Sequence, residues 1–283
     1  MIKYLVIGDP VGHSRSPGMQ NAAFEKYGLG TSYGMRRVRP EELPEFFEYA
    51  RKNFRGVNLT IPHKTQAVTL SDELTTRARI CGSVNTLLIE NGKITGDSTD
   101  GVGLERALRD NFDLAVKGNR FLFFGAGGAA RATSIHFALC GVGEIIFVNR
   151  TIENALSIIR DIQKAVPEVK TRAILPSERE NVRAALETCD ALIQATSLGL
   201  KDDDPPPFDL DLLRSGMNLK IFDTIYRETP LQRRAAELGI PVAGGKEMLI
   251  HQGAASFEWW TQLPAPLDEM RKGFELPPGG IEV

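Results

Sequence analysis

The chain has 283 residues, of which 42% are hydrophobic and 25% are charged. This composition is typical of soluble globular proteins and excludes a disordered or fibrous chain. The 34 basic and 36 acidic side chains give a formal net charge of −2. That balance argues against a nucleic-acid-binding protein, whose affinity depends on neutralising phosphates, and it gives no polybasic footprint for a membrane surface.

At roughly 100–200 residues per domain, the length predicts two domains. No stretch reaches the roughly 20 apolar residues of a membrane span, and the apolar N-terminal run is too short for a signal peptide. The three cysteines, Cys81, Cys140 and Cys189, are far apart and have neither disulfide-framework nor zinc-site spacing. We therefore expect a reducing cytoplasm, buried thiols and, with only four scattered histidines, no metal site.

Strand-like and helix-like segments alternate along the first hundred residues, which is typical of α/β proteins. The expected elements are a strand at 4–7, a helix at 17–27 capped by Ser16, a helix at 40–53, a strand at 56–59 and a helix at 72–80. Asn91-Gly92 then stands between two apolar runs and predicts a β-hairpin. An antiparallel hairpin implies a mixed sheet in this region.

From about residue 101 the pattern becomes a run of βα units. The continuous apolar segment at 121–124 is typical of a parallel strand covered on both faces. Further strands are expected at 145–148, 171–175, 191–195 and 219–223, with helices ending near 139 and spanning 152–166 and 246–261. We place the domain boundary near 101–103, with a second crossing near residue 240.

The segment Gly125–Ala130 fits the dinucleotide-binding pattern G-x-G-x-x-[GA], follows a predicted strand and opens a predicted helix. Gly125 allows the tight turn, Gly127 lets the backbone approach a pyrophosphate, and small Ala130 allows close packing of helix and strand. The helix N-terminus supplies N–H donors and partial positive charge to the anion. The alternative is a tight turn that holds no ligand.

The residues after the strand at 145–148 indicate which dinucleotide would bind. An NAD site places Asp or Glu there to accept a hydrogen bond from the ribose 2′-hydroxyl, whereas this chain has Asn149, Arg150 and Thr151. A guanidinium matches a 2′-phosphate in charge and geometry, and the flanking side chains add neutral donors. The segment therefore predicts NADP, although Arg150 could instead be a solvated residue at a helix start.

Three polar segments of the first region suggest a substrate site. Ser14 and Ser16, at a helix start after a strand, can direct both hydroxyls at one small carboxylate, whereas helix capping would explain only one of them. Lys64 is expected in the first turn of a short helix, where a positive charge is electrostatically unfavourable. It therefore either has a functional role or is an ordinary solvated surface lysine. Asp100 is either the cap of a helix at 101–111 or a group near the domain junction.

Taken together, these segments resemble the shikimate dehydrogenases over essentially the whole chain. The matching strings occur in family order: GHSRSP (12–17), NLTIPHK (58–64), GSVNT (82–86), TDG (99–101), GAGGAARA (125–132), NRT (149–151), ATSLG (195–199), DTIY (223–226), TPL (229–231), ML (248–249) and QGA (252–254).

The resemblance implies an oxidoreductase of aromatic amino-acid and chorismate biosynthesis that reversibly reduces 3-dehydroshikimate to shikimate with NADP(H). It also implies a mixed-sheet α/β substrate domain, residues 1–102 completed by C-terminal helices at 246–283, and a Rossmann-like NADP-binding domain at 103–245. Lys64 and Asp100 would be catalytic. The implied substrate ligands are Ser14, Ser16, Thr60, Asn85, Tyr226 and Gln252. The implied cofactor ligands are Gly125, Ala126, Gly127, Gly128, Ala129, Asn149, Arg150, Thr151, Thr196, Thr224 and Gly245.

Two departures from the family pattern keep other functions open. Met19-Gln20-Asn21 replaces a segment in which most members carry His, and Ser98 replaces a usual Asn. The first variant resembles the quinate/shikimate branch, so the first alternative is an enzyme that uses both polyols. A non-catalytic dinucleotide-binding regulator is the second. We expect a cytoplasmic monomer or homodimer that binds a small-molecule substrate and neither nucleic acid nor membranes.

Overall fold

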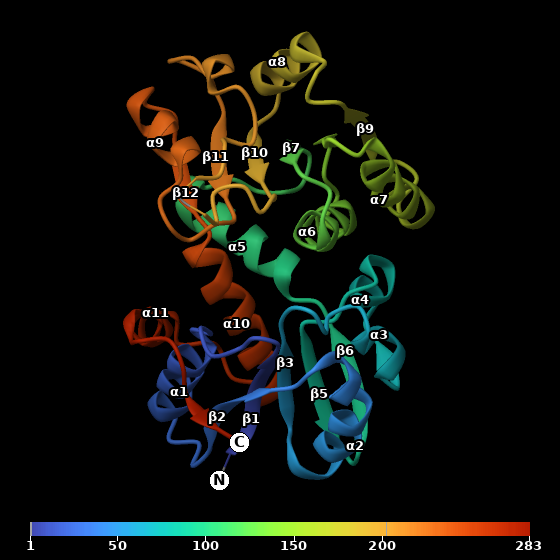
Figure 1. Cartoon of the computed structure of the whole chain (residues 1–283), viewed down its shortest axis with the longest axis vertical. Helices are drawn as coiled ribbons and strands as arrows, with labels where there is room; N and C mark the ends of the chain where they lie inside the picture. Colours follow the sequence, from blue (N-terminus) through green and yellow to red (C-terminus); the bar gives the residue numbers. More distant parts are fainter. Residues whose placement is uncertain (1, 202) are drawn as a thin grey trace. The chain divides into compact units, whose positions relative to one another are not determined.

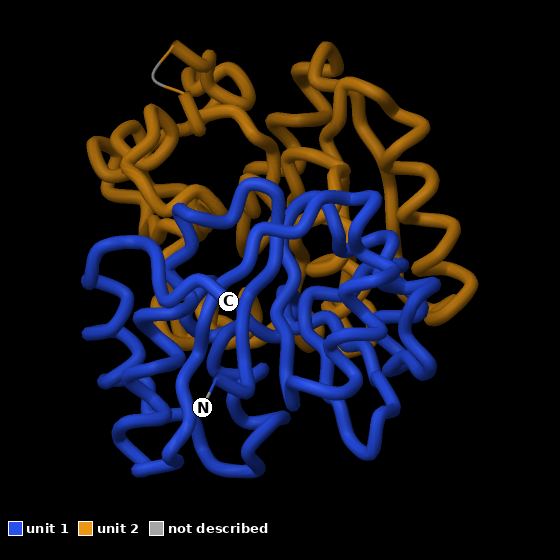
Figure 2. The backbone as a smooth tube through the Cα atoms, turned by 60° about the horizontal axis from the view of Figure 1, so that its bottom comes forward, with its two compact units in different colours: residues 1–103, 249–283 blue, residues 104–248 orange. Residues whose placement is uncertain are grey.

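The computed structural model describes residues 2–201 and 203–283 (Figure 1). Two compact units make up the chain: unit 1 contains the residues up to 103 together with 249–283, and unit 2 contains residues 104–248 (Figure 2). Within the described residues, no helix has both the length and the apolar character that crossing a membrane requires.

Unit 1 is built on a seven-stranded sheet with the order β13-β2-β1-β3-β5-β6-β4. Its β3 pairs antiparallel with β5, and β5 with β6, whereas the other pairs are parallel, so the expected mixed sheet is confirmed. Asn91 and Gly92 have φ values of 52° and 78°, as the hairpin between β5 and β6 requires. The strands are β1 (Ile2–Gly8), β2 (Ser32–Arg37), β3 (Gly56–Leu59), β4 (Glu73–Leu74), β5 (Thr86–Glu90), β6 (Lys93–Asp97) and β13 (Ile281–Glu282).

Helices cover both faces of this sheet, and alternate residues of β1 divide between the two layers. Leu5 and Ile7 pack in the layer of α2, whereas Tyr4 and Val6 pack in the layer of α1, α10 and α11. The C-terminal helix α10 is therefore an integral part of this layer. The helices are α1 (Ser16–Lys26), η1 (Pro40–Glu42), α2 (Leu43–Asn53), α3 (Ala67–Leu70), α4 (Thr76–Cys81), α10 (Lys246–Thr261) and α11 (Leu267–Glu275). A further helix, α5 (Asp100–Phe112), starts in unit 1 and has residues 104–112 in unit 2.

Unit 2 is a parallel six-stranded sheet with the order β12-β11-β10-β7-β8-β9. Leu122 and Phe124 of β7 pack in the core that includes α8 and α9, whereas Phe121 and Phe123 contact Phe137 of α6. The expected Rossmann-like fold is thus confirmed. Its elements are β7 (Arg120–Phe124), α6 (Gly128–Leu139), β8 (Glu144–Val148), α7 (Ile152–Ala165), β9 (Lys170–Ile174), α8 (Arg179–Thr188), β10 (Ala191–Gln194), η2 (Leu210–Leu212), β11 (Lys220–Asp223), α9 (Pro230–Glu237) and β12 (Val242–Gly244).

Three local predictions for unit 1 are wrong. Ser16 does not cap α1, because Arg15 is the N-cap residue and makes no side-chain capping bond. Lys64 lies in the turn before α3 and not in a helical first turn. The helix expected at 72–80 starts only at Thr76, since Glu73–Leu74 pairs with β6 and the Thr75 side chain caps α4.

The sequence analysis also missed several short elements, namely β2, α8, α9, β12 and β13. β2 reads SYGMRR and has no clear alternation of apolar residues, yet it pairs in parallel with β1 along six residues. Its strand conformation therefore depends on a tertiary contact that the local pattern does not report.

The contact between β3 and the end of α10 can be tested at Gly56. A Cβ atom there would lie 2.5 Å from Cε2 of Trp260, and the indole is held by a 2.8 Å hydrogen bond from Nε1 to the Leu87 carbonyl oxygen. We expect Gly56→Ala to lower the free energy of unfolding by about 1–3 kcal/mol, as overpacking does. Urea denaturation followed by tryptophan fluorescence measures this, since both tryptophans lie in α10.

Gly12→Ala is the matched control for this experiment. A Cβ atom at Gly12 would meet nothing within 4 Å, so its free energy of unfolding should change by less than about 1 kcal/mol. If Gly56→Ala is as stable as the parent chain, the close packing of Trp260 on β3 is contradicted.

Candidate active site

One edge of the unit 1 sheet gathers most of the polar residues that the sequence singled out. β1 and β3 run parallel and both end at this edge, and the antiparallel β5 begins there because Thr86 pairs with Asn58 and with Asp97. Loops after β1, β3 and β6 therefore leave from the same side. These loops and the helix starts that follow them carry Ser14, Ser16, Thr60, Lys64 and Asp100, and Asn85 directly precedes β5 at the same edge.

Lys64 and Asp100 form an ion pair at this edge. The Lys64 Nζ atom lies 2.7 Å from Oδ2 of Asp100, and the two side chains are 30% and 13% exposed. Asp100 is the first residue of α5, and the backbone carbonyl of Lys64 accepts a 2.8 Å hydrogen bond from the Val84 N–H. The pair is therefore half-buried, with Lys64 the more exposed partner.

His63 anchors the turn that carries Lys64. Its ring is buried, and Nε2 lies 2.7 Å from the carbonyl oxygen of Val38. Burial lowers the pKa of His63, so the neutral ring donates this hydrogen bond at neutral pH. The turn is thus attached to the segment after β2 without a charge that would compete with Lys64.

Asn85 connects the ion pair to the C-terminal helix. Its Nδ2 atom lies 2.8 Å from Oδ1 of Asp100 and 3.3 Å from Oε1 of Gln252 on α10, while its Oδ1 atom accepts a 2.8 Å hydrogen bond from the Thr99 N–H. Asp100 therefore receives one donor on each carboxylate oxygen, from Lys64 and from Asn85. This arrangement fixes the plane of the carboxylate.

A buried carboxylate that the sequence analysis did not single out holds the turn before Asp100. Asp97 is 2% exposed and forms a two-pronged ion pair with Arg77, whose Nε atom lies 2.8 Å from Oδ1. Thr75 Oγ1 and the Ser98 N–H also donate to this carboxylate. Sequence spacing could not predict this ion pair, because Arg77 lies in α4 and Asp97 lies 20 residues later at the end of β6.

A second buried polar chain runs from the Ser14 loop toward α10. Ser14 Oγ accepts a 3.2 Å hydrogen bond from the Ser16 N–H, and Ser16 is itself nearly buried. Tyr33 donates from its hydroxyl to Oδ1 of Asn58 at 2.8 Å, and Nδ2 of Asn58 lies 3.0 Å from Ser256 Oγ. Burial raises the pKa of Tyr33 well above its usual range, while a hydrogen bond with Ser16 opposes the rise, so the hydroxyl remains a donor.

The glycine-rich turn of unit 2 has the geometry that the pattern predicts. Gly125 follows β7 with φ of +105°, and a Cβ atom there would lie 2.8 Å from the Ala195 carbonyl oxygen, so only glycine fits. Added Cβ atoms at Gly127 and Gly128 would meet nothing within 4 Å, and no side chain caps the N-terminus of α6. The first N–H groups of this helix thus suit an anion such as pyrophosphate.

Asn149, Arg150 and Thr151 lie beside this turn, because Phe124 and Val148 are paired at the ends of β7 and β8. Asn149 Nδ2 donates to the Thr151 carbonyl oxygen at 2.7 Å, and Arg150 and Thr151 are exposed. Across residues 2–201 and 203–283, no acidic side chain forms an ion pair with Arg150. Its guanidinium is therefore available for an anion.

The remaining predicted residues of unit 2 follow the ends of three neighbouring strands. Thr196 comes after β10, Thr224 after β11 and Gly245 after β12, where the Gly245 N–H donates to the Ile225 carbonyl oxygen at 3.0 Å. Tyr226 is 55% exposed. All of these residues share the carboxyl edge of the sheet with Gly125, the edge at which open α/β sheets bind ligands.

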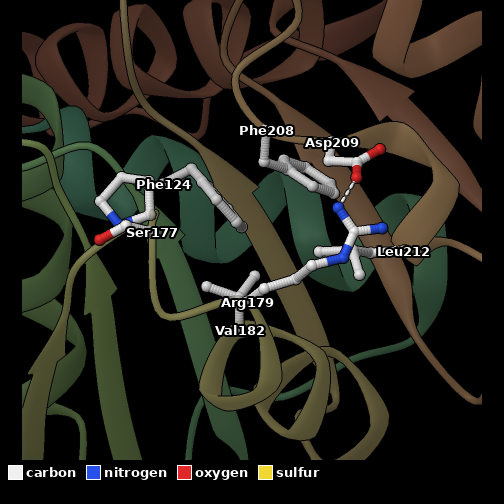
Figure 3. Close-up of a pocket in the computed structure, with 8 residues that line it drawn as sticks. Phe124, Ser177, Arg179, Val182, Phe208, Asp209 and Leu212 are labelled. Carbon is white, nitrogen blue, oxygen red and sulfur yellow. Dashed lines mark hydrogen bonds and ion pairs between the residues drawn. The ribbon is translucent and has the colours of Figure 1, made fainter.

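A pocket of about 300 Å³ adjoins the glycine-rich turn, since Phe124 in its wall directly precedes Gly125 (Figure 3). Phe124 and Phe208 stack with ring centroids 4.3 Å apart, and Arg179 forms an ion pair with Asp209 across the rim. The sequence analysis did not find this pocket, because the loop containing Phe208 carries no recognisable motif. None of the predicted cofactor residues lines it.

Comparison with known proteins agrees with both units. Residues 6–87 match the shikimate dehydrogenase substrate binding domain, and residues 245–272 match the shikimate 5′-dehydrogenase C-terminal domain. The chain is 38% identical to shikimate dehydrogenase (NADP(+)) of Methanopyrus kandleri, over 94% of this chain and 92% of that protein.

Two solved structures extend this similarity to the fold. Shikimate 5-dehydrogenase from Listeria monocytogenes, in complex with shikimate and NAD, is 32% identical with a TM-score of 0.90 over 96% of each chain. The enzyme from Thermus thermophilus, in complex with NADP(H) and shikimate, is 32% identical with a TM-score of 0.84 over 97% of this chain and 98% of that chain. The glycine-rich turn, the Lys64–Asp100 pair and these matches together show that the chain belongs to the shikimate dehydrogenase family.

Proposed function

We propose that this chain catalyses the reversible, NADP-dependent reduction of 3-dehydroshikimate to shikimate, a step of aromatic amino-acid biosynthesis. The observation that carries the proposal is the Lys64–Asp100 ion pair of 2.7 Å, oriented by Asn85, on the sheet edge that also carries Ser14 and Ser16. Relatives that bear the name shikimate dehydrogenase (NADP(+)) support the reaction and the cofactor.

Unit 1 would be the substrate domain. The hydroxyls of Ser14 and Ser16 would bind the substrate carboxylate, because two donors on one loop match its two oxygens. Thr60, Asn85 and Gln252 would hold the ring hydroxyls, and Tyr226 is proposed as a further substrate ligand. Buried amides suit this task, since they both donate and accept hydrogen bonds.

Lys64 would move the proton of the reaction. Its ammonium group has three N–H donors, of which one points to Asp100, so another can bind the substrate ketone oxygen. There it stabilises the negative charge that develops and donates a proton to it. Asp100 orients the ammonium and accepts a hydrogen bond from the substrate hydroxyl, and in the reverse direction the Lys64 amine takes back the proton of that hydroxyl. The dinucleotide, when bound, supplies the hydride.

Unit 2 would hold NADP. The uncapped N-terminus of α6, with Gly125–Ala129, fits the pyrophosphate, and the exposed Arg150 with Asn149 and Thr151 fits the 2′-phosphate. Thr196, Thr224 and Gly245 would line the nicotinamide half. The proposed setting is a reducing cytoplasm, which suits three cysteines that form no disulfide in the described chain, and the proposed assembly is a monomer or a homodimer.

A quinate/shikimate dehydrogenase is the second candidate, and the observation that favours it is Gln20. This side chain belongs to the Met19-Gln20-Asn21 segment that departs from the family pattern, is fully buried, and has its Nε2 atom 2.8 Å from the carbonyl oxygen of Gly253. Gly253 directly follows Gln252, so the hydrogen bond from Gln20 helps to position the backbone next to a residue proposed to bind ring hydroxyls. A non-catalytic regulator is disfavoured, because it would not need the Lys64–Asp100 pair.

Replacing Lys64 tests the proposed proton transfer. We expect Lys64→Ala to lower kcat by roughly 10²–10⁴-fold with little change in KM, the usual contribution of a positioned acid. Lys93→Ala is the matched control, because Lys93 forms an exposed ion pair of 2.6 Å with Glu73 in the same unit. Steady-state oxidation of shikimate measures both variants, and a nearly unchanged kcat in Lys64→Ala removes this residue from the chemistry.

Replacing Arg150 tests the choice of cofactor. The parent chain should have a higher kcat/KM with NADPH than with NADH. Arg150→Ala should lower kcat/KM for NADPH by about 10–100-fold and barely change that for NADH, since hydrogen bonds to charged groups contribute about 1.5–3 kcal/mol. Arg233→Ala, which removes an exposed guanidinium paired with Glu228, serves as the control. Equal or better use of NADH by the parent chain argues against the assignment.

Parallel oxidation assays separate the two candidate enzymes. With NADP, we expect kcat/KM for shikimate to exceed that for quinate by about tenfold or more, because unmatched polar groups in a hydrogen-bonding site are strongly rejected. A simple 2-hydroxy acid should give no turnover. Comparable rates with quinate would favour the second candidate over the first.

A further inference from the structure

Three metal-binding side chains that the proposed reaction does not use come together in unit 2. Glu105 lies on α5, and His136 and Cys140 lie four residues apart at the C-terminal end of α6. The His136 Nε2 atom is 2.7 Å from Oε2 of Glu105 and 3.4 Å from Sγ of Cys140, and that sulfur is 3.7 Å from the same carboxylate oxygen. Each side chain thus directs one ligand atom to a common point.

These separations are close to those that a tetrahedral zinc ion imposes. With Zn–N and Zn–O bonds of about 2.0 Å and Zn–S of about 2.3 Å, ligand atoms lie about 3.3–3.6 Å apart. Only the contact between His136 and Glu105 is shorter, since those atoms now share a hydrogen bond. A small rotation of the Glu105 carboxylate would open it. Thiolate, imidazole and carboxylate are ligands that Zn²⁺ accepts in one site.

The surroundings of the three residues also favour a cation. Cys140 is the C-cap residue of α6, and the C-terminal end of a helix carries partial negative charge. His136 is 8% exposed, whereas the Glu105 side chain is 24% exposed, so water can reach one side of the cluster. The Arg109 guanidinium lies 3.9 Å from the other oxygen of Glu105, Oε1, and leaves Oε2 facing His136 and Cys140.

We propose that Glu105, His136 and Cys140 form a binding site for a thiophilic divalent cation, best matched by Zn²⁺, with water as the fourth ligand. Binding would release the thiol proton of Cys140 to solvent, while His136 would bind through Nε2 as the neutral imidazole that carries its proton on Nδ1. The ion would tie α5 to the end of α6 and so stabilise the folded chain.

Spacing along the sequence could not reveal this site. His136 and Cys140 are separated by one helical turn, but Glu105 lies 31 residues before His136 and on another helix. The expectation that no metal site exists depended on linear spacing alone. The three residues are adjacent only because α5 packs beside the end of α6 within unit 2.

Equilibrium titration of the full-length protein with Zn²⁺ alone, against a chromophoric chelator, tests the site. We expect one ion per chain with micromolar or tighter affinity, and Cys140→Ser and His136→Gln should each weaken binding at least about tenfold. Cys189→Ala is the matched control, since this buried thiol belongs to the same unit and is outside the cluster. It should retain the parent affinity.

Cobalt provides a readout that does not depend on enzyme activity. Co²⁺ bound by a thiolate gives a charge-transfer absorption band, which should appear in the parent chain and in Cys189→Ala but be absent in Cys140→Ser. Thermal denaturation with and without Zn²⁺ shows whether each variant folds. Zn²⁺ should raise Tm in the parent chain and in Cys189→Ala, in which the cluster is intact, but not in Cys140→Ser. No Zn²⁺ uptake, or equal affinity in Cys140→Ser and the parent chain, overturns the proposal.

Discussion

The side-chain amide of Asn85 orders the polar edge of unit 1. It contacts Asp100, Thr99 and Gln252 at the same time, and Asp100 in turn holds the ammonium group of Lys64. A buried amide stays at such a position only when its hydrogen bonds are satisfied, because an unpaired polar group costs about 1–3 kcal/mol. The segments after β3 and β6, the segment before β5 and the helix α10 therefore keep one geometry around the proposed substrate site.

Strand direction explains why this edge exists. The sheet of unit 1 becomes antiparallel at β5, so the start of that strand meets the ends of β1, β3 and β6. In unit 2 every described strand is parallel, and the proposed cofactor residues instead follow successive strand ends. The same rule, that ligands bind where parallel strands end, thus accounts for the proposed substrate site in unit 1 and the proposed anion site in unit 2.

The sequence predicts those parts of the fold and of the proposed site that depend on neighbouring residues, and not those that depend on contacts between distant segments. The turn at Gly125 needs glycine for its own backbone, and the segment 246–261 is a 16-residue run without proline, so both were predicted correctly. The role of Lys64 came from resemblance to a family and not from spacing. Three other features depend on contacts between distant segments, which no local pattern encodes. They are the hydrogen bond from Tyr33 to Asn58, the ion pair of Arg77 with Asp97, and the cluster around His136.

The central claim is that Lys64 and Asp100 act as one unit in proton transfer, and a double-mutant cycle on kcat tests it most directly. When two residues act as a unit, replacing either one removes most of their joint contribution to kcat, so replacing the second has little further effect. The account predicts that the Lys64→Ala, Asp100→Asn double variant is hardly slower than the slower single variant. Losses in kcat that multiply, as for independent groups, would contradict it.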